Sequence, residues 1–345
     1  MSRTIDTKSP KKALLLICEG NKTEPIFFSN FISKDDFVFD IFPKPKLSQD
    51  DIKTSSNRGM NRRPKRQLLG DDVIEDIPIV GPPPKSWIDA AEKEFDTYEE
   101  IWCVFDKDGH PTCSDAFEKA KAIKQSGYNL NIAFSSISIE YYFLLHFEHI
   151  YKPFCKSECK ASKKKKANCM LQNAVPGKSC LGDRCVNGYA RLKGYWTDSK
   201  SGENIIYPIL KDKLYIGIKN AELLRRESNS HEGNKPFYDR NPYTTVDFLV
   251  ARLLGYRILD SEPITTKAGT TTLSITKKDT HITLLNKGNT SFIVNSNFVT
   301  LSNGNHAINN KYILHPNDTI ELELLGNVGD IFFINDTIER IIIIK

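Results

Sequence analysis

The sequence predicts an α/β protein: a parallel sheet with flanking helices, followed by a cysteine-rich insert and a C-terminal all-β domain. Over the first 150 residues, short apolar runs that end in acidic residues alternate with helical patterns, which is typical of a parallel sheet. Five of the eight cysteines lie within residues 155–185. After residue 256, runs of alternating apolar and polar residues recur every eight to ten residues, which indicates an antiparallel sandwich or small barrel.

These patterns divide the chain into four segments. We expect an α/β core at residues 1–150, with a basic loop at 47–84 inside it, and a cysteine- and lysine-rich insert at 151–211. Residues 212–256 have helical patterns and are expected to complete the α/β domain, while residues 257–345 form the sandwich-like domain.

Length and composition limit the classes of protein that need to be considered. With 345 residues, of which 39% are hydrophobic, the chain is long enough for two or three globular domains. No stretch approaches the roughly 20 apolar residues that cross a bilayer, and the N-terminal MSRTIDTKSPKK lacks the apolar core of a signal peptide. We therefore expect a cytoplasmic protein with no membrane partner. The net charge of +5 is too small to indicate nucleic-acid binding without local basic patches.

The stretch from Lys12 to Glu24 begins with an expected strand, where the apolar run ALLLI at residues 13–17 leads towards Glu19. Such a run is typical of a strand that is buried on both faces, and it places Glu19 at the carboxyl end of the strand. Gly20 permits a tight turn, while Thr23 and Pro25 suit the start of a helix. Ligands bind at this corner in open α/β sheets.

Further acids follow two later apolar runs. The run at residues 100–105 leads into Asp106 and Asp108, and the run at 129–135 precedes a helix that carries Glu140. Alone, each acid has an ordinary alternative as a helix cap or solvated turn residue. Several uncompensated carboxylates at one sheet edge are costly unless a cation neutralises them, so together these acids predict a Mg²⁺ or Mn²⁺ site.

Three motifs, CEGNKTEPIFF, VFDKD and SISIEYYFLLHF, resemble in combination the RloB family of bacterial defence-associated proteins, which are Toprim-like. The resemblance covers residues 10–150, with a weaker similarity in NPYTTVDFLVARL at 241–253. It implies the parallel sheet and metal chemistry of the Toprim fold, which topoisomerases, primases and some nucleases share. It does not extend to the basic loop, the cysteines after residue 150 or the β-rich C-terminal part.

The resemblance implies a Mg²⁺-dependent nuclease that acts on RNA, including tRNA, or on phage DNA. Asp106 and Asp108 would hold the metal, and Glu19 would ligate it or act as general base. Glu140 would complete the metal's shell, and Lys22 would meet the substrate phosphate. In the alternative interpretation the acids are remnants, and the chain is a non-catalytic nucleic-acid-binding or assembly module that senses infection.

The insert has a composition that favours a structural metal. Its cysteines, separated by three, nine, ten and four residues, are Cys155, Cys159, Cys169, Cys180 and Cys185. The lysine-rich stretch between them has too little apolar content to pack a core, and cytosolic proteins do not normally use disulfides. We therefore expect four of the five thiolates to hold Zn²⁺, with free cysteines in a loose insert as the alternative.

Three other features have two interpretations each. The basic loop at 47–84 is either a solubilising insertion or a flap that binds phosphates. Tyr189, Tyr195 and Trp196 either stack on unpaired bases or pack beneath the insert. His110 either orients a water, ligates the metal or, as we expect, is a solvated loop residue.

The β-rich C-terminal part has no clustered acids, histidines or cysteines, so we assign it to recognition or assembly. Its partner would be a second copy of the chain or another protein of a defence system. The final run RIIIIK would favour aggregation as a free edge strand, so we expect it to be paired either in the sheet or at an interface.

Overall fold

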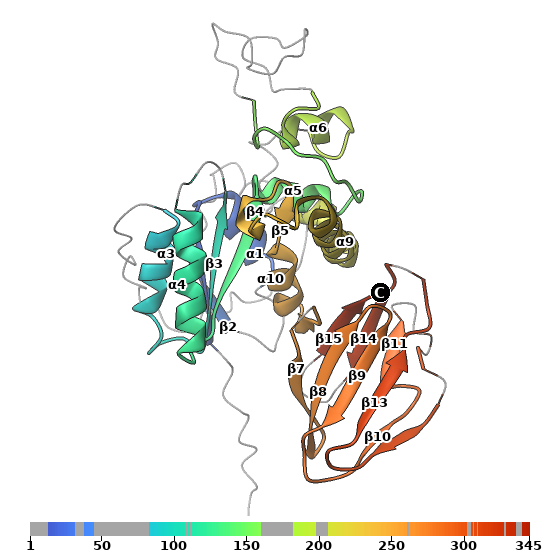
Figure 1. The fold of residues 1–345 in the computed structure, drawn as a ribbon. Helices are drawn as coiled ribbons and strands as arrows, with labels where there is room; N and C mark the ends of the chain where they lie inside the picture. The colour runs from blue at the N-terminus through green and yellow to red at the C-terminus, as the bar shows by residue number, and fades with distance from the viewer. Residues whose placement is uncertain are drawn as a thin grey trace, which may run out of the picture. The chain divides into compact units, whose positions relative to one another are not determined.

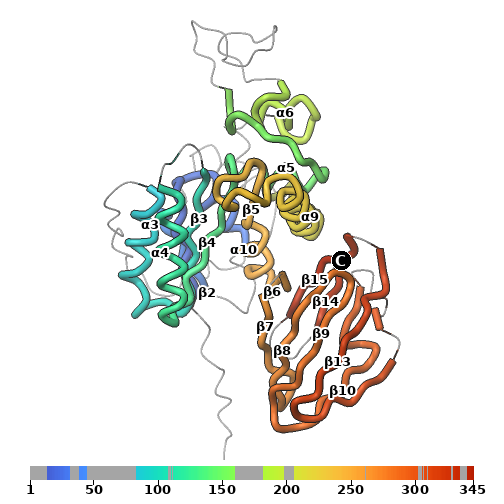
Figure 2. Tube along the Cα trace, viewed as in Figure 1, coloured from blue at the N-terminus to red at the C-terminus, as the bar shows by residue number. Residues whose placement is uncertain are grey.

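The computed structural model describes residues 13–31, 38–44, 83–107, 110, 112–159, 182–197, 206–260, 262–301, 305, 307–308, 310–327, 329–335 and 340–345. The chain forms two compact units (Figures 1 and 2). The α/β unit comprises Met1–Leu144, Lys152–Asp212 and Asn234–Thr244. The C-terminal unit comprises Leu145–Tyr151, Lys213–Gly233 and Thr245–Lys345.

Five strands in the described part of the α/β unit form one sheet, in the order β2-β1-β3-β4-β5 (Figure 1). They are β1 (Ala13–Cys18), β2 (Val38–Phe42), β3 (Glu100–Asp106), β4 (Leu130–Ser136) and β5 (Tyr243–Thr244). The first four run parallel and β5 runs antiparallel to β4. This confirms the predicted parallel core, and it makes β1, β3 and β4 direct neighbours.

Helices cover the sheet because its strands are apolar on both faces. Helices α3 (Lys85–Glu92) and α4 (Cys113–Gln125) lie side by side on the face that carries Leu15 and Ile17 (Figure 1). Helices α1 (Thr23–Ser29) and α5 (Ile139–Leu144) meet through Phe27 and Phe143, whose ring centroids are 4.8 Å apart. The unit also contains α6 (Val186–Leu192), α8 (Ile206–Leu210) and the 3-10 turns η1 (Lys211–Lys213) and η2 (Phe237–Asp239).

The C-terminal unit contains the predicted all-β region. Its strands are β6 (Tyr256–Ile258), β7 (Ile264–Ala268), β8 (Thr271–Lys278), β9 (His281–Asn286), β10 (Phe292–Val294), β11 (Val299–Leu301), β12 (Tyr312–Leu314), β13 (Thr319–Glu323), β14 (Ile331–Asn335) and β15 (Arg340–Ile344). Among the described residues they form sheets in the orders β11-β14-β15-β6 and β13-β9-β8-β7, with a β10-β12 ribbon. One buried core joins the two larger sheets, with Leu273 and Ile282 from one and Phe332 and Ile341 from the other.

The isoleucine-rich end of the chain is paired, as predicted. Strand β15 lies between β14, to which it is antiparallel, and β6, to which it is parallel. Its residues Ile341–Ile344 are all buried. The strand therefore exposes no free edge within its sheet.

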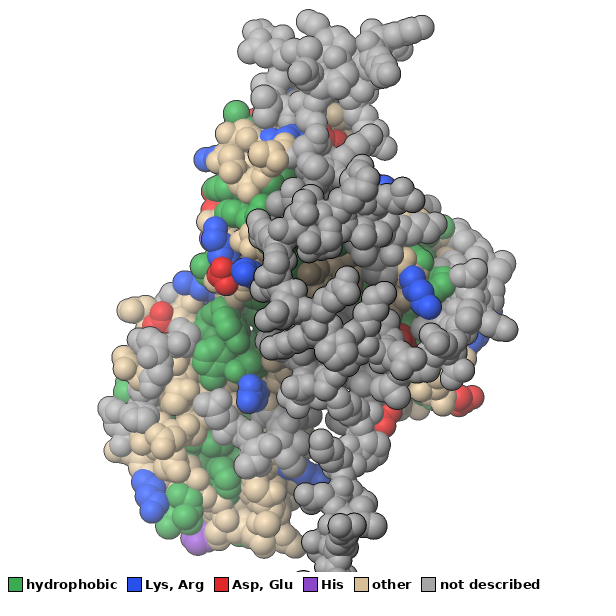
Figure 3. Space-filling model, turned by 180° about the vertical axis from the view of Figure 1, so that it is seen from behind, with side chains coloured by type: hydrophobic (Ala, Val, Ile, Leu, Met, Phe, Trp, Pro, Cys, Tyr) green, Lys and Arg blue, Asp and Glu red, His purple; other side chains and the backbone are tan. Residues whose placement is uncertain are grey.

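Over the C-terminal strands, lysine and arginine side chains are set apart from one another among apolar and uncharged polar groups on the face in Figure 3.

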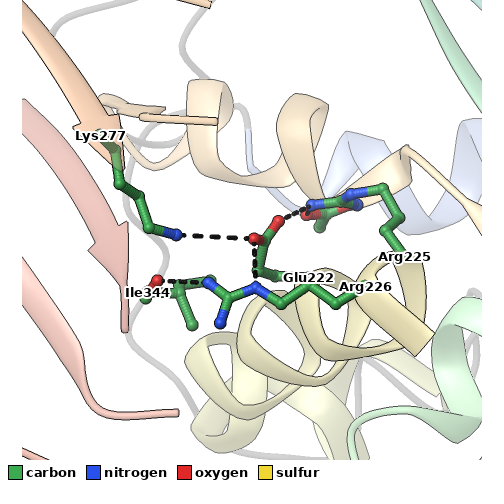
Figure 4. A network of polar contacts seen from close by, with 6 residues as sticks. Glu222, Arg225, Arg226, Lys277 and Ile344 are labelled. Atoms are coloured by element: carbon green, nitrogen blue, oxygen red, sulfur yellow. Dashed lines mark hydrogen bonds and ion pairs between the residues drawn. The ribbon is translucent and has the colours of Figure 1, made fainter. Parts of the chain in front are cut away.

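The predicted domain boundary placed residues 212–256 in the α/β domain, but the structure assigns two helices of this segment to the other unit. Helices α9 (Leu214–Glu232) and α10 (Val246–Leu253) belong to the C-terminal unit. Glu222 on α9 pairs with Lys277 of β8 at 3.7 Å, and Arg226 donates to the Ile344 carbonyl at 2.6 Å (Figure 4). These polar contacts fix α9 against the C-terminal strands. No helix in the described ranges is both long and apolar enough to span a bilayer.

Candidate metal centre

Glu19 is held at the junction of β1 and β3. Its backbone N–H donates to the Val104 carbonyl at 2.9 Å, which extends the β1–β3 ladder by one residue. Its carboxylate accepts the backbone N–H of Asp106 at Oε2 (2.9 Å) and lies 2.8 Å from His110 Nε2 at Oε1. The predicted strand-end acid is therefore fixed directly beside the end of β3.

Asp106 is the last residue of β3, and its surroundings are acidic. Burial raises its pKa well above the usual value, and the charges of Glu24, Glu140 and Glu19 raise it further. A hydrogen bond from the Ile139 backbone, at the start of α5, opposes this shift. The predicted acids Glu19, Asp106 and Glu140 are therefore brought together at the carboxyl edge of the sheet, where their charges repel one another.

Sequence reasoning missed Glu24 as a member of this cluster. The side chain lies in the first turn of α1 and is 7% exposed, which is low for a carboxylate. A Cβ atom at Gly20 would come within 2.5 Å of Glu24 Oε2, so a side chain at this position would require the Glu24 carboxylate to move. The sequence feature that could have identified Glu24 was its position, five residues after Glu19 at the start of a predicted helix.

The other predicted site residues have different positions. Glu140 is half-buried in the first turn of α5, where its Oε2 accepts a hydrogen bond from Ser157 Oγ at 3.1 Å. Lys22 is exposed in the turn between β1 and α1, so its ammonium is accessible to a phosphate. Asp108 lies outside the described residues, as does most of the basic loop at 47–84.

His110 differs from the expectation of a solvated loop residue. Its ring is half-buried, and Nε2 is 2.8 Å from Glu19 Oε1. The ring also contacts Trp87 edge-on, with centroids 6.0 Å apart. The adjacent Lys107 pairs with Asp239 at 3.2 Å. His110 therefore orients Glu19. The two residues meet because β3 pairs with β1, and His110 follows the end of β3 as Glu19 follows the end of β1.

The donor set suits a hard divalent cation, which prefers carboxylate oxygens. Within the ranges that the structure describes, however, no group of three or more Asp, Glu, His or Cys side chains stands ready to hold a metal ion. The carboxylates thus share one edge without forming a finished coordination shell. A cation bound here would relieve the repulsion that raises the pKa of Asp106.

The insert brings its first cysteines beside its last. Cys155 N–H donates to the Arg184 carbonyl at 3.1 Å, and an isolated parallel bridge joins Lys156 to Cys185. Cys185 caps α6, and its Sγ accepts the Gly188 N–H at 3.3 Å. Cys155 is exposed, Cys159 and Cys185 are buried, and Cys169 and Cys180 lie outside the described residues.

The aromatic residues in and after α6 favour packing over base stacking. Tyr189 and Trp196 are 8% and 6% exposed, so neither ring offers a face to a nucleic-acid base. Tyr189 also packs against Phe154, with ring centroids 5.6 Å apart. These residues form a small core beneath the cysteine segment.

We expect purified protein to contain one equivalent of zinc. A structural Zn²⁺ contributes folding free energy to the segment that it joins, so its removal should unfold residues 155–185 locally and leave the α/β sheet folded. Elemental analysis measures the metal, and proteolysis with and without a chelator measures the local effect. Metal-free native protein whose thiols all react with an alkylating agent would contradict this prediction.

The fold and the site together define an α/β protein with an acidic centre at the carboxyl edge of a parallel sheet. The model of the family described as RloB-like protein matches residues 14–253, and the chain belongs to this family. The matched region contains all the acids of the centre and ends before the strands from β6 onward. No curated protein and no solved structure matches the chain.

Proposed function

We propose that this protein is a Mg²⁺-dependent nuclease of the Toprim type, which cleaves RNA, including tRNA, or DNA in bacterial defence against phage. The observation that best supports the proposal is the set of carboxylates around Asp106. Glu19, Glu24 and Glu140 come from three different elements, and their charges converge on the end of β3. Carboxylates gathered in this way repel one another and do not stabilise the fold, but they suit a site that binds a divalent cation.

In this proposal, Asp106, Asp108 and Glu19 would hold Mg²⁺, and Glu24 and Glu140 would supply the remaining negative charge. The cation, when bound, would supply charge stabilisation for the scissile phosphate. His110 holds Glu19 in one orientation through the contact at 2.8 Å. The exposed ammonium of Lys22 binds a substrate phosphate and thereby orients the nucleic acid.

A second candidate function is a non-catalytic nucleic-acid-binding or assembly module of a defence complex. The observation that favours it is that the described side chains provide no ready group of three metal ligands. In either function the C-terminal strands serve recognition or assembly, through a second copy of the chain or a partner protein.

Incubation of the purified protein with end-labelled tRNA, single-stranded RNA and single- and double-stranded DNA distinguishes the two functions. We expect cleavage of at least one substrate with Mg²⁺ or Mn²⁺ and none with EDTA, because the metal supplies the charge stabilisation. Binding of nucleic acid without cleavage, at every metal concentration and on every substrate, would support the non-catalytic module instead.

A further inference from the structure

The insert reaches the acidic centre through a chain of side-chain hydrogen bonds. Ser157 Oγ donates to Glu140 Oε2 at 3.1 Å. Asn187, in the first turn of α6, donates from Nδ2 to Ser157 Oγ at 3.4 Å. Trp196, which follows the same helix, donates from Nε1 to Asn187 Oδ1 at 3.0 Å. The chain thus joins the segment between Cys155 and Cys159 to a carboxylate of the site.

The direction of every bond in this chain follows from Trp196. An indole N–H can only donate, so the amide oxygen of Asn187 faces it and the amide N–H₂ faces Ser157. The Ser157 oxygen therefore accepts from Asn187, and its hydroxyl proton points to Glu140. A carboxylate, which is an acceptor-only group when ionised, completes the chain.

The inner members of the chain are fixed in place. Asn187 and Trp196 are 2% and 6% exposed, so a lost hydrogen bond between them would leave buried polar atoms unsatisfied. The backbone N–H of Asn187 also donates to the Ser157 carbonyl at 3.0 Å. Ser157 is therefore tied to α6 through both its backbone and its hydroxyl, and it presents that hydroxyl from a rigid base.

Glu140 is the member of the acidic centre that needs such support. Glu19 is held by the Asp106 N–H and by His110, and Glu24 is packed against Gly20. The hydrogen bond from Ser157 is the contact that orients the carboxylate of Glu140 from the insert side. The charge of this carboxylate is one of those that act on Asp106, so its placement affects the negative charge at the end of β3.

We propose that Ser157 is a positioning residue for the metal centre: held by Asn187 and Trp196, it orients Glu140 towards the cation that Asp106 binds. The cysteine-rich insert then contributes to metal affinity through Ser157. This inference rests on the proposed function, because it requires that the acidic centre binds a divalent cation. Groups that orient metal ligands typically contribute 10–100-fold to metal affinity or activity.

The test is Mn²⁺ affinity, measured by calorimetry, together with kcat and KM for the best nucleic-acid substrate. We expect Ser157→Ala to weaken Mn²⁺ binding about 10-fold and to lower kcat by a similar factor, with KM for nucleic acid unchanged. Ser157→Thr keeps the hydroxyl and should restore most of the affinity. Ser126→Ala, which removes an exposed hydroxyl at the end of α4, is the matched control and should change neither quantity.

A double variant tests whether Ser157 acts through Glu140. If it does, Glu140→Gln combined with Ser157→Ala should bind Mn²⁺ as weakly as Glu140→Gln alone. Additive losses would overturn the inference, as would a Ser157→Ala protein that binds Mn²⁺ as tightly as the wild type, and either result leaves the proposed nuclease intact. Wild-type protein that binds no Mn²⁺ would overturn the inference and the proposed metal chemistry together.

Discussion

Asp106→Asn should lower Mg²⁺-dependent cleavage by at least about 10²–10³-fold in kcat, which is the loss typical when one preorganised electrostatic group is removed from an active site. Asp106 ends β3 at the point where the charges of Glu19, Glu24 and Glu140 meet. An amide keeps the shape of the side chain but removes the negative charge that binds the cation. Steady-state kinetics at saturating Mg²⁺ measures the effect.

The same substitution should not destabilise the metal-free protein. The pKa of Asp106 is raised above its value of about 3.9 in an unfolded chain, so ionisation of this group costs folding free energy as pH rises between the two values. Asparagine cannot ionise and avoids that cost. In EDTA at pH 7, Asp106→Asn should therefore melt at the same temperature as the wild type or higher.

Asp96→Asn is the matched control, because Asp96 is an exposed acid in the turn after α3. It should leave both cleavage and melting temperature unchanged. Full activity in Asp106→Asn would refute the nuclease assignment. A large fall in melting temperature would instead mean that Asp106 has a structural role.

Arg225→Met should lower the free energy of unfolding of the C-terminal unit by about 3–5 kcal/mol, which is typical when one partner of a buried ion pair is removed. Arg225 is 4% exposed and binds both carboxylate oxygens of Asp247, which is fully buried, at 2.6 and 2.9 Å. It also donates to Glu222 at 3.0 Å (Figure 4). The variant leaves the charge of Asp247 without a counterion, so we expect a melting temperature about 10 °C lower.

The pH dependence of this variant has a defined sign. Burial raises the pKa of Asp247 to about 6 even though Arg225 opposes the shift. Without Arg225 the folded-state pKa rises further, while the unfolded value stays near about 3.9. The free energy of unfolding of the variant should therefore keep falling as pH rises above 6. In the wild type, the contribution of Asp247 to the free energy of unfolding is constant in that range. The stability deficit should be larger at pH 8 than at pH 5.

Arg225→Met combined with Asp247→Asn removes the stranded charge and should recover part of the loss. Lys267→Met changes an exposed cation on β7 and should alter stability by less than about 0.5 kcal/mol. A stability deficit of Arg225→Met that is the same at all pH values would contradict the role assigned to Asp247. No stability deficit at all would show that the packing of α9 and α10 does not depend on this ion pair.

Local sequence determined much of the α/β sheet and the position of its acids. Short, mainly apolar runs that are bounded by turn signals favour buried strands, so β1, β3 and β4 were predictable, as was the placement of Glu19 after β1 and of Asp106 at the end of β3. The alternating pattern after residue 256 predicted the C-terminal sheets, because a strand with one buried face places an apolar side chain at every second residue. The β-branched run of β15 also predicted that this strand is paired, and the structure pairs it with β14 and β6.

Strand β5 shows the limit of such local patterns. Tyr243 and Thr244 lie in the segment 212–256, whose patterns are helical, but they pair with the end of β4. The hydroxyl of Thr244 bonds that of Ser135 at 2.9 Å. A strand this short has no period of its own, so its conformation is set by its neighbour.

Contacts between residues far apart in the chain were decided only by the tertiary structure. Glu24 joined the acidic centre because α1 starts against the turn at Gly20, and His110 reached Glu19 because the chain returns after β3. The bond from Ser157 to Glu140 and the pairing of α9 with the C-terminal strands have the same origin. The physical reason is that periodicity and turn chemistry act over a few residues, whereas burial, hydrogen bonding and charge depend on which side chains the folded chain brings within a few ångströms.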